Sequence, residues 1–435
     1  MASIRVTRSR EPMQQKAERP PRVLVCPSGF KESLQPHVVA DCIEKGILVA
    51  CPHARVIKAP LVDGGEGTTE ALVAATGGQL YPVEVLGPTR QPVQSCFGII
   101  GGQAKKTAVI EMAAAAGLSL VPRDQRNPLH TTTFGVGQLI VAALNAGAEH
   151  ILVGCGDSGT CDGGIGMAQA LGARFMNGDG TQILDASGSL PLAGLASIDL
   201  IGLDPRLATV PIDVACNWHN VLCGPRGVAR VFGPQKGATL EDVLRLESAM
   251  EKVAAICSTY LGRDISTEPG SGASGGLGAG LLLLGATLHS RFDIIFRFLA
   301  IEAFMADCDI VFTAEGSLDD QTPRGKIPAE VARMARRYQV PVIALAGTIG
   351  KGADTNYKTG IRAFMSICSR PVSLEKAILE AEHLLAKAAE SSMRMVMVGQ
   401  GFDLEKILRA PNESMPRSAT VGISVVSNVQ LQNYE

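Results

Sequence analysis

The stretch that decides the fold reads G-C-G-D-S-G-T-C-D-G-G-I-G from Gly154 to Gly166. It follows the apolar run Ile151–Val153, which is typical of a buried strand. Between its glycines stand four polar residues, Asp157, Ser158, Thr160 and Asp162. Glycine lets backbone N–H groups approach an anion closely, but two carboxylates repel a phosphate unless a metal ion or a cationic group lies between them. The stretch therefore predicts a site for a metal-bound or hydroxylated anion. A tight turn before a helix, with Asp and Ser as caps, is the alternative.

The same order of strand, glycine-containing loop and helix recurs near both ends of the chain, which predicts a parallel sheet. The early elements are strands over Val23–Cys26 and Arg55–Pro60 and helices over Ser33–Val49 and Thr68–Ala75. The late elements are strands over Ile310–Ala314, Val340–Ala346 and Arg362–Ser369 and helices over Pro328–Tyr338 and Ser373–Met397.

Between these two regions the pattern changes. Three short alternating segments, separated by Gly and Pro, favour antiparallel or mixed pairing: Tyr81–Val85, Gln94–Ile100 and Thr107–Met112. We therefore expect an α/β fold in which a discontinuous Rossmann-like parallel-sheet domain (22–80 and 300–398) carries a second, mixed α/β domain inserted at 81–299. Residues 1–21 are expected to form a disordered leader, and 399–435 a poorly ordered tail.

Composition excludes several classes of protein. A net charge of −2 and an aromatic content of 4% argue against a nucleic-acid partner. The longest apolar run is too short to span a membrane. The 11 cysteines include no C-x-x-C pair, which favours reduced thiols and a cytoplasmic location. A homodimer is one assembly that the sequence allows.

Charged residues gather where the predicted parallel strands end, and ligands bind at that edge of an open sheet. They are Lys31, Asp63, Glu66, Glu315, Asp319, Asp320, Arg324 and Lys326. Carboxylates and cations together suit phosphoryl transfer, which needs Mg²⁺, cations for the phosphates and a proton acceptor. Taken singly, each could instead be a solvated surface residue or a turn cap. No Walker A loop is present, since Gly325-Lys326 is followed by Ile327. The loop after the first strand also lacks the G-x-G-x-x-G fingerprint of dinucleotide-binding proteins.

From Val23 to about Met397 the chain resembles the type I glycerate kinases, because many motifs occur in the same order. They are F-K-E-S-L (30–34), D-G-G-E-G-T (63–68), V-I-E-M-A (109–113), R-N-P-L followed by T-T (126–132), D-G-G-I-G-M (162–167), F-G-P-Q-K-G-A (232–238), S-G-G-L-G (274–278), E-G-S-L-D (315–319) and R-G-K-I-P (324–328). The resemblance implies Mg²⁺- and ATP-dependent phosphorylation of D-glycerate to 2-phosphoglycerate, and a Rossmann-like domain split by an insertion.

Charge and placement then suggest a role for each residue. We expect Asp162 or Asp319 to accept the substrate proton, with Lys31 as a further catalytic residue. Substrate or phosphate would be bound by Ser28, Lys31, Asp157, Ser158, Thr160, Arg226, Lys236, Arg324 and Lys326. The expected ligands of Mg²⁺ are Asp63, Glu66 and Glu315.

Two departures from the family pattern keep alternatives open. Ser28 stands where the family often has an aspartate, and Asp157 adds an acid to the glycine-rich stretch. A kinase for another small hydroxy acid is one alternative reading of the chain. A non-catalytic binding or regulatory protein on the same scaffold is another.

Overall fold

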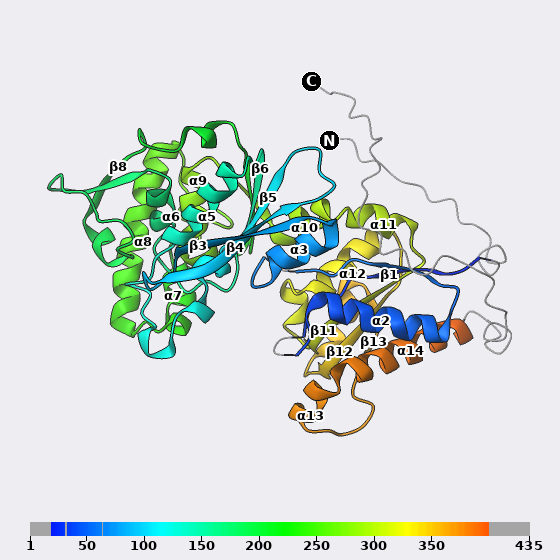
Figure 1. Ribbon diagram of the computed structural model, residues 1–435. Coiled ribbons are helices and arrows are strands. Elements are labelled where there is room, and N and C mark those ends of the chain that lie inside the picture. The colour runs from blue at the N-terminus through cyan, green and yellow to red at the C-terminus, as the bar shows by residue number, and fades with distance from the viewer. Residues whose placement is uncertain (1–18, 31–32, 63, 400–435) are drawn as a thin grey trace. The chain divides into compact units, whose positions relative to one another are not determined.

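The computed structural model describes residues 19–30, 33–62 and 64–399 (Figure 1). The chain divides into two compact units: unit 1 contains the described residues up to Leu61 and from Ala300 onward, and unit 2 runs from Val62 to Leu299. Most of the expected leader, the expected tail beyond Gly399, and the site candidates Lys31 and Asp63 lie outside the described residues.

Unit 1 is built on a five-stranded sheet in the order β13-β12-β11-β1-β2, and every neighbouring pair is parallel. The strands are β1 (Arg22–Val25), β2 (Arg55–Lys58), β11 (Ile310–Leu318), β12 (Val342–Ile349) and β13 (Ile361–Ser366). The prediction of a parallel sheet assembled from both ends of the chain is confirmed. The strand order changes direction between β1 and β11, because β1 continues to β2 on one side whereas β11 continues to β12 on the other.

The helices of unit 1 cover both faces of this sheet, because right-handed crossovers in opposite directions place their helices on opposite sides. Helices α2 (Pro36–Ala50) and α14 (Ala381–Gly399) lie side by side (Figure 1, blue and orange), although they come from opposite ends of the chain. They pack on the alternate strand residues Val23, Val25 and Phe312. The helices α11 (Ile301–Asp307), α12 (Ile327–Arg337) and α13 (Leu374–Leu379) complete the unit.

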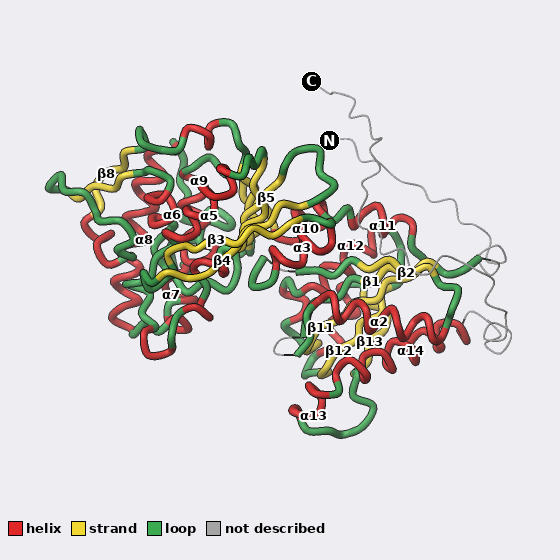
Figure 2. The backbone as a smooth tube through the Cα atoms, in the orientation of Figure 1, coloured by secondary structure: helices red, strands yellow, loops and turns green. Residues whose placement is uncertain are grey.

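Unit 2 contains a six-stranded mixed sheet in the order β10-β9-β6-β5-β4-β3 (Figure 2, yellow). Its strands are β3 (Gln79–Leu86), β4 (Pro92–Ile100), β5 (Thr107–Glu111), β6 (His150–Gly154), β9 (Ile212–Cys216) and β10 (Thr287–Ser290). The β3–β4 and β4–β5 pairs are antiparallel and the others are parallel, as the change of pattern after residue 80 predicts. A separate antiparallel pair joins β7 (Arg174–Asn177) to β8 (Leu195–Asp199).

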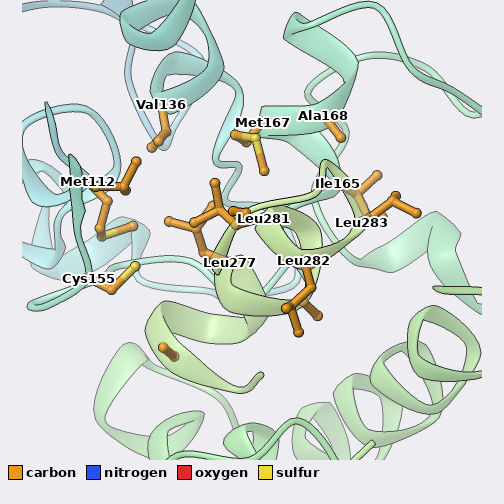
Figure 3. Close-up of a cluster of buried hydrophobic side chains, with 14 of the residues drawn as sticks. Met112, Val136, Cys155, Ile165, Met167, Ala168, Leu277, Leu281, Leu282 and Leu283 are labelled. Atoms are coloured by element: carbon orange, nitrogen blue, oxygen red, sulfur yellow. The ribbon is translucent and has the colours of Figure 1, made fainter. Parts of the chain in front are cut away.

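The core of unit 2 is organised around α9, a helix that is buried along its whole length. In Figure 3 its residues Leu277 and Leu281 lie among the side chains of Met112, Cys155 and Met167. The helices of the unit are α3 (Thr68–Thr76), α4 (Ala113–Ala116), α5 (Phe134–Asn145), α6 (Ile165–Ala170), α7 (Val228–Phe232), α8 (Leu240–Leu261), α9 (Ala273–Leu283) and α10 (Arg291–Phe298). In the described part of the chain, no helix has both the length and the apolar character that a membrane span requires.

Three details differ from the sequence-based expectation. The first boundary between the units follows Leu61 and not residue 80, because α3 packs on β4 and β5 of unit 2. Strand β11 does not end at Glu315-Gly316 but continues to Leu318, since Ser317 still pairs with Thr348 of β12. The single helix expected from Ser373 is divided at Glu380 into α13 and α14.

An acidic residue links three parallel strands of the unit 2 sheet. Asp213 of β9 lies 3.0 Å from Nε2 of His150 on β6 and 2.7 Å from Nε2 of His289 on β10. Burial raises the pKa of Asp213, but the hydrogen bonds to the two histidines outweigh burial and leave its pKa below the usual range. The ionised carboxylate therefore stabilises the folded chain.

We expect the variant Asp213→Asn to lower the free energy of unfolding by about 1–3 kcal/mol at pH 7. A depressed folded-state pKa gives stabilisation that is present above about 3.9, the unfolded value, and is lost as the pH falls through the folded value. Urea unfolding of both proteins at pH 7 and pH 3 should therefore show a difference that shrinks in acid. Asp185→Asn, at an exposed position of the same unit, is the control. Equal stability of the two variants at pH 7 would contradict the prediction.

Candidate active site

The reversal of strand order between β1 and β11 marks the ligand-binding edge of unit 1, because open α/β sheets bind ligands beyond the carboxyl ends of strands at such a point. Ser28 follows β1, and its hydroxyl donates to the carbonyl of Ala314 on β11 at 2.9 Å. Open space lies beside Gly316, where an added Cβ would meet only the Cα of Phe30, at 3.9 Å. A ligand can therefore approach the backbone closely at this glycine.

A lysine and two carboxylates meet at the carboxyl end of β11, where Glu315 belongs to the strand and Asp319 and Lys326 to the segment that follows it. The Nζ of Lys326 lies 3.2 Å from the carbonyl oxygen of Ser317, 3.4 Å from Oδ1 of Asp319 and 3.7 Å from Oε1 of Glu315. Asp319 also accepts from the backbone N–H of Gln321 at 2.9 Å. Burial raises the pKa of Asp319, but that amide and the Lys326 ammonium outweigh it and leave the pKa lowered. The loop thus presents an ionised carboxylate next to a cation.

In unit 2, the carboxylate of Asp162 is completely buried and surrounded by donors. It accepts from the backbone N–H of Thr133 at 2.8 Å, from the Thr133 hydroxyl at 2.9 Å, and from the N–H groups of Gly164 and Gly166 at 3.1 and 3.3 Å. Burial raises its pKa, although these hydrogen bonds act in the opposite direction. Because both carboxylate oxygens already accept hydrogen bonds, the geometry favours a role in holding the loop over the expected role of proton acceptor.

Glycines in the Gly154–Gly166 stretch and in the 270–278 segment allow backbone segments to touch. A Cβ at Gly156 would lie 2.6 Å from the Cα of Gly65, and one at Gly275 would lie 1.9 Å from the carbonyl oxygen of Thr160. Three loops, 64–67, 154–164 and 270–278, therefore meet without intervening side chains. The backbone N–H of Glu66 donates to Oδ2 of the exposed Asp157 at 3.1 Å, which joins the first loop to the second.

The buried side chain of Lys236 contacts the 154–164 loop. Only 2% of the residue is exposed, and its Nζ lies 2.8 Å from Oγ of Ser158 and 2.6 Å from the carbonyl oxygen of Thr160. Burial lowers the pKa of Lys236 to about 8. This lysine therefore has no direct access to a dissolved ligand and can act on one only through its neighbours.

The carboxylates expected to bind Mg²⁺ suit an ion that is also held by substrate phosphates, and not an ion enclosed by protein ligands alone. Among the described residues, no three His, Cys, Asp or Glu side chains are grouped so that they could hold a metal ion. Of the expected ligands, Glu66 belongs to unit 2 and Glu315 to unit 1. Mg²⁺ usually takes one or two carboxylates, substrate phosphates and water, so single carboxylates such as these fit this ion.

Comparison with known proteins decides the family. The model of the glycerate kinase family matches residues 23–397, which span the strands and loops described above. The chain belongs to the glycerate kinase family. As a member of this family it is a kinase, which implies a nucleotide as phosphoryl donor.

Individual members of the glycerate kinase family are similar over nearly their whole length. A glycerate kinase of Bacillus subtilis (strain 168) is 45% identical over 369 residues, which cover 85% of this chain and 96% of that protein. A glycerate 2-kinase of Escherichia coli (strain K12) is 41% identical, with 87% and 98% covered. A crystal structure described as that of a glycerate kinase 2 from Salmonella typhimurium LT2 is 42% identical, with a TM-score of 0.76 and with 88% of this chain and all of that chain covered.

The site residues expected for a glycerate kinase fall into three groups by exposure. Exposed side chains, which a ligand can reach, are Glu66, Asp157, Arg226 and Arg324. Buried residues are Ser158, Thr160, Asp162 and Lys236, whereas Ser28, Glu315, Asp319 and Lys326 are partly exposed. The structure thus brings Glu315, Asp319 and Lys326 together in unit 1 and Ser158, Thr160 and Lys236 together in unit 2.

Sequence reasoning did not assign a role to Glu111, although it lies in the V-I-E-M-A motif. Glu111 ends β5, is 6% exposed, and accepts from the backbone N–H of Thr69 at the start of α3 at 3.2 Å. Burial raises its pKa to about 7, against the lowering effect of the backbone amides of Thr69, Gly67 and Thr68. The signal in the sequence was an acid that ends an otherwise apolar strand. Glu111 anchors the helix that follows the 64–67 loop.

We expect the variant Glu111→Gln to remove a pH dependence of stability. A raised folded-state pKa gives stabilisation that is present below about 4.5 and is lost as the pH rises through about 7. Relative to the variant, the wild type should therefore lose about 3 kcal/mol of unfolding free energy between pH 4.5 and pH 8. Urea unfolding at both pH values measures this, with Glu70→Gln on the exposed side of α3 as the control. A difference that does not change with pH would refute the prediction.

Proposed function

We propose that this protein transfers the γ-phosphoryl group of ATP to D-glycerate, with Mg²⁺, and forms 2-phosphoglycerate. The observation that carries the proposal is the placement of Lys326 beside Asp319 and Glu315, at the edge of the unit 1 sheet where the strand order reverses. The similarity to a glycerate 2-kinase supports the position of the new phosphate. All eleven cysteines lie among the described residues and none forms a disulfide, which favours a reducing compartment, and we place the reaction in the cytoplasm.

Lys326 and Asp319 would divide the work of phosphoryl transfer. The ammonium of Lys326 would offset negative charge on a phosphate oxygen, exchanging its present carboxylate contacts for the ligand. The Asp319 carboxylate would orient the attacking hydroxyl and take its proton as the bond to phosphorus forms. A carboxylate with a lowered pKa stays ionised at neutral pH and can therefore accept a hydrogen bond from that hydroxyl before the reaction.

The remaining carboxylates would hold the divalent cation. In unit 1, Glu315 on β11 carries an oxygen donor; in unit 2, Glu66 carries one on the glycine-rich 64–67 loop, and Asp63 directly precedes that loop in the sequence. When bound, Mg²⁺ would neutralise charge that develops on the phosphate oxygens. Ser28 replaces an acid of the family pattern, and because its hydroxyl donates to Ala314 it supports the β1–β11 junction.

The reaction can be tested directly by a ³¹P NMR time course with the purified protein, ATP, Mg²⁺ and D-glycerate. We expect a new phosphomonoester signal that matches 2-phosphoglycerate, with equal loss of ATP. A 3-phosphoglycerate signal would retain the kinase and refute the proposed regiochemistry. Turnover of another small hydroxy acid in place of glycerate would refute the substrate. Nucleotide binding without turnover of any acid would point to a binding or regulatory protein on this scaffold.

A pair of variants should distinguish the two aspartates that the sequence suggests as proton acceptor. We expect Asp319→Asn to lower kcat by roughly 10²–10⁴-fold while the thermal midpoint stays close to that of the wild type. Asp162→Asn should instead lower the thermal midpoint, because an amide N–H₂ group would face the donors that now bind the carboxylate. Steady-state kinetics and thermal unfolding of both proteins provide the measurement. A stable Asp162→Asn protein that has lost kcat would reverse the assignment.

A further inference from the structure

Lys236 is a buried cation whose position gives Ser158 a fixed hydrogen-bonding direction. The lysine belongs to the 3₁₀ turn Pro234–Lys236 of unit 2, and its Nζ contacts the Ser158 hydroxyl at 2.8 Å and the Thr160 carbonyl at 2.6 Å. An ammonium group has three donors and no acceptor. The Ser158 oxygen must therefore accept from Lys236, and the hydrogen of that hydroxyl must point in another direction.

Lys236 is largely protonated at neutral pH. Burial lowers the pKa of Lys236 to about 8, while the Cys161 thiol and the Asp162 carboxylate, which face it from the 154–164 loop, act to raise it. With that value roughly nine-tenths of the molecules carry the ammonium at pH 7. Above pH 8 the neutral amine gains a lone pair, which can accept the Ser158 hydrogen and turn it away from the ligand.

Ser158 is a suitable contact for an anion, because 9% of the residue is exposed, whereas only 2% of Lys236 is. It lies in the loop that follows β6, at the carboxyl end of a parallel strand, and Lys236 is the hydrogen-bond partner that its hydroxyl has within the described chain. A cation behind a hydroxyl strengthens the hydroxyl as a donor, since charge-assisted hydrogen bonds polarise their neighbours. An acceptor that carries negative charge gains most from such a donor.

We propose that Ser158 binds an anionic oxygen of a substrate as a hydrogen-bond donor only, and that Lys236 is the positioning residue that enforces this direction and supplies charge through the hydroxyl. The inference rests on the proposed function, which supplies two sources of such an oxygen: the carboxylate of the hydroxy acid and a phosphate of the nucleotide. Lys236 itself touches neither of them. The expected phosphate-binding lysine thus becomes a residue that acts through its neighbour.

Steady-state kinetics at pH 7 of four proteins test the proposal: the wild type, Ser158→Ala, Lys236→Met and the double variant. Loss of a hydrogen bond to a charged group should raise one KM roughly 10- to 100-fold in Ser158→Ala. A rise in the KM for glycerate identifies the carboxylate as the partner, and a rise in the KM for ATP identifies a phosphate. The double variant should match Ser158→Ala, because Lys236 acts through that hydroxyl.

The pH dependence of KM distinguishes a positioning role of Lys236 from a purely structural one. In the wild type the affected KM should rise as the pH increases from 7 to 9.5, whereas in Ser158→Ala it should stay flat over the same range. Ser189→Ala is the matched control, because Ser189 is another buried serine of unit 2 and its hydroxyl donates to the Pro128 carbonyl. That control should keep both KM values and the pH profile of the wild type.

Two results would overturn the inference: unchanged KM values in Ser158→Ala, or the same pH profile in that variant and the wild type. Failure of the proposed function is recognised separately, because the wild type would then not phosphorylate glycerate. In that case the rise in thermal midpoint caused by glycerate, or by ATP with Mg²⁺, replaces KM as the readout. Equal rises in the wild type and Ser158→Ala would again refute the role of Ser158, and a smaller rise in the variant would support it.

Discussion

The hydrogen bonds that converge on the carboxylate of Asp162 hold together the loop that carries the candidate site residues Ser158 and Thr160. They join the start of α5, through Thr133, to the start of α6, through Gly164 and Gly166. A carboxylate without these donors would be very costly in such a buried position. Ser158 and Thr160 precede Asp162 in the same loop, so their positions follow from this one group.

In both units glycine-containing segments follow parallel strands, at the edge of the sheet where we propose that ligands bind. In unit 1 the open side of Gly316 leaves room beside a short cluster of charged side chains. In unit 2 the glycines instead allow loops to pack on one another, and the buried polar groups between them include the Ser158 hydroxyl and the Lys236 ammonium. A glycine-rich sequence therefore has two physical meanings in one chain, and only the contacts distinguish them.

Local patterns in the sequence predict the regular elements well where the signals are local. Helix α8 is an example of such local signals, because a capping box joins Thr239 to Asp242 at its start and Gly262 takes a left-handed conformation at its end. The break at Glu380 and the continuation of β11 past Gly316 could not be predicted, since tertiary pairing determines both.

The same limit applies to the site. Residue types at strand ends predict which loops carry charge, and the cluster around Lys326 follows from them. Sequence spacing does not reveal burial, however, so Lys236 and Asp162 look like surface groups until their surroundings are known. Glu111 was missed for the same reason, because its importance comes from the helix that starts beside it.

The split of unit 1 across the chain has a consequence for synthesis on the ribosome. All elements of unit 2 lie between residues 62 and 299 and can pair with one another as soon as that continuous segment has emerged. Strand β1 and helix α2 emerge first, yet their neighbours β11 and α14 are made only after residue 309 and after residue 380. Since domains fold as units during translation, the earliest part of the nascent chain must wait longest for its partners, with the apolar face of α2 exposed in the meantime.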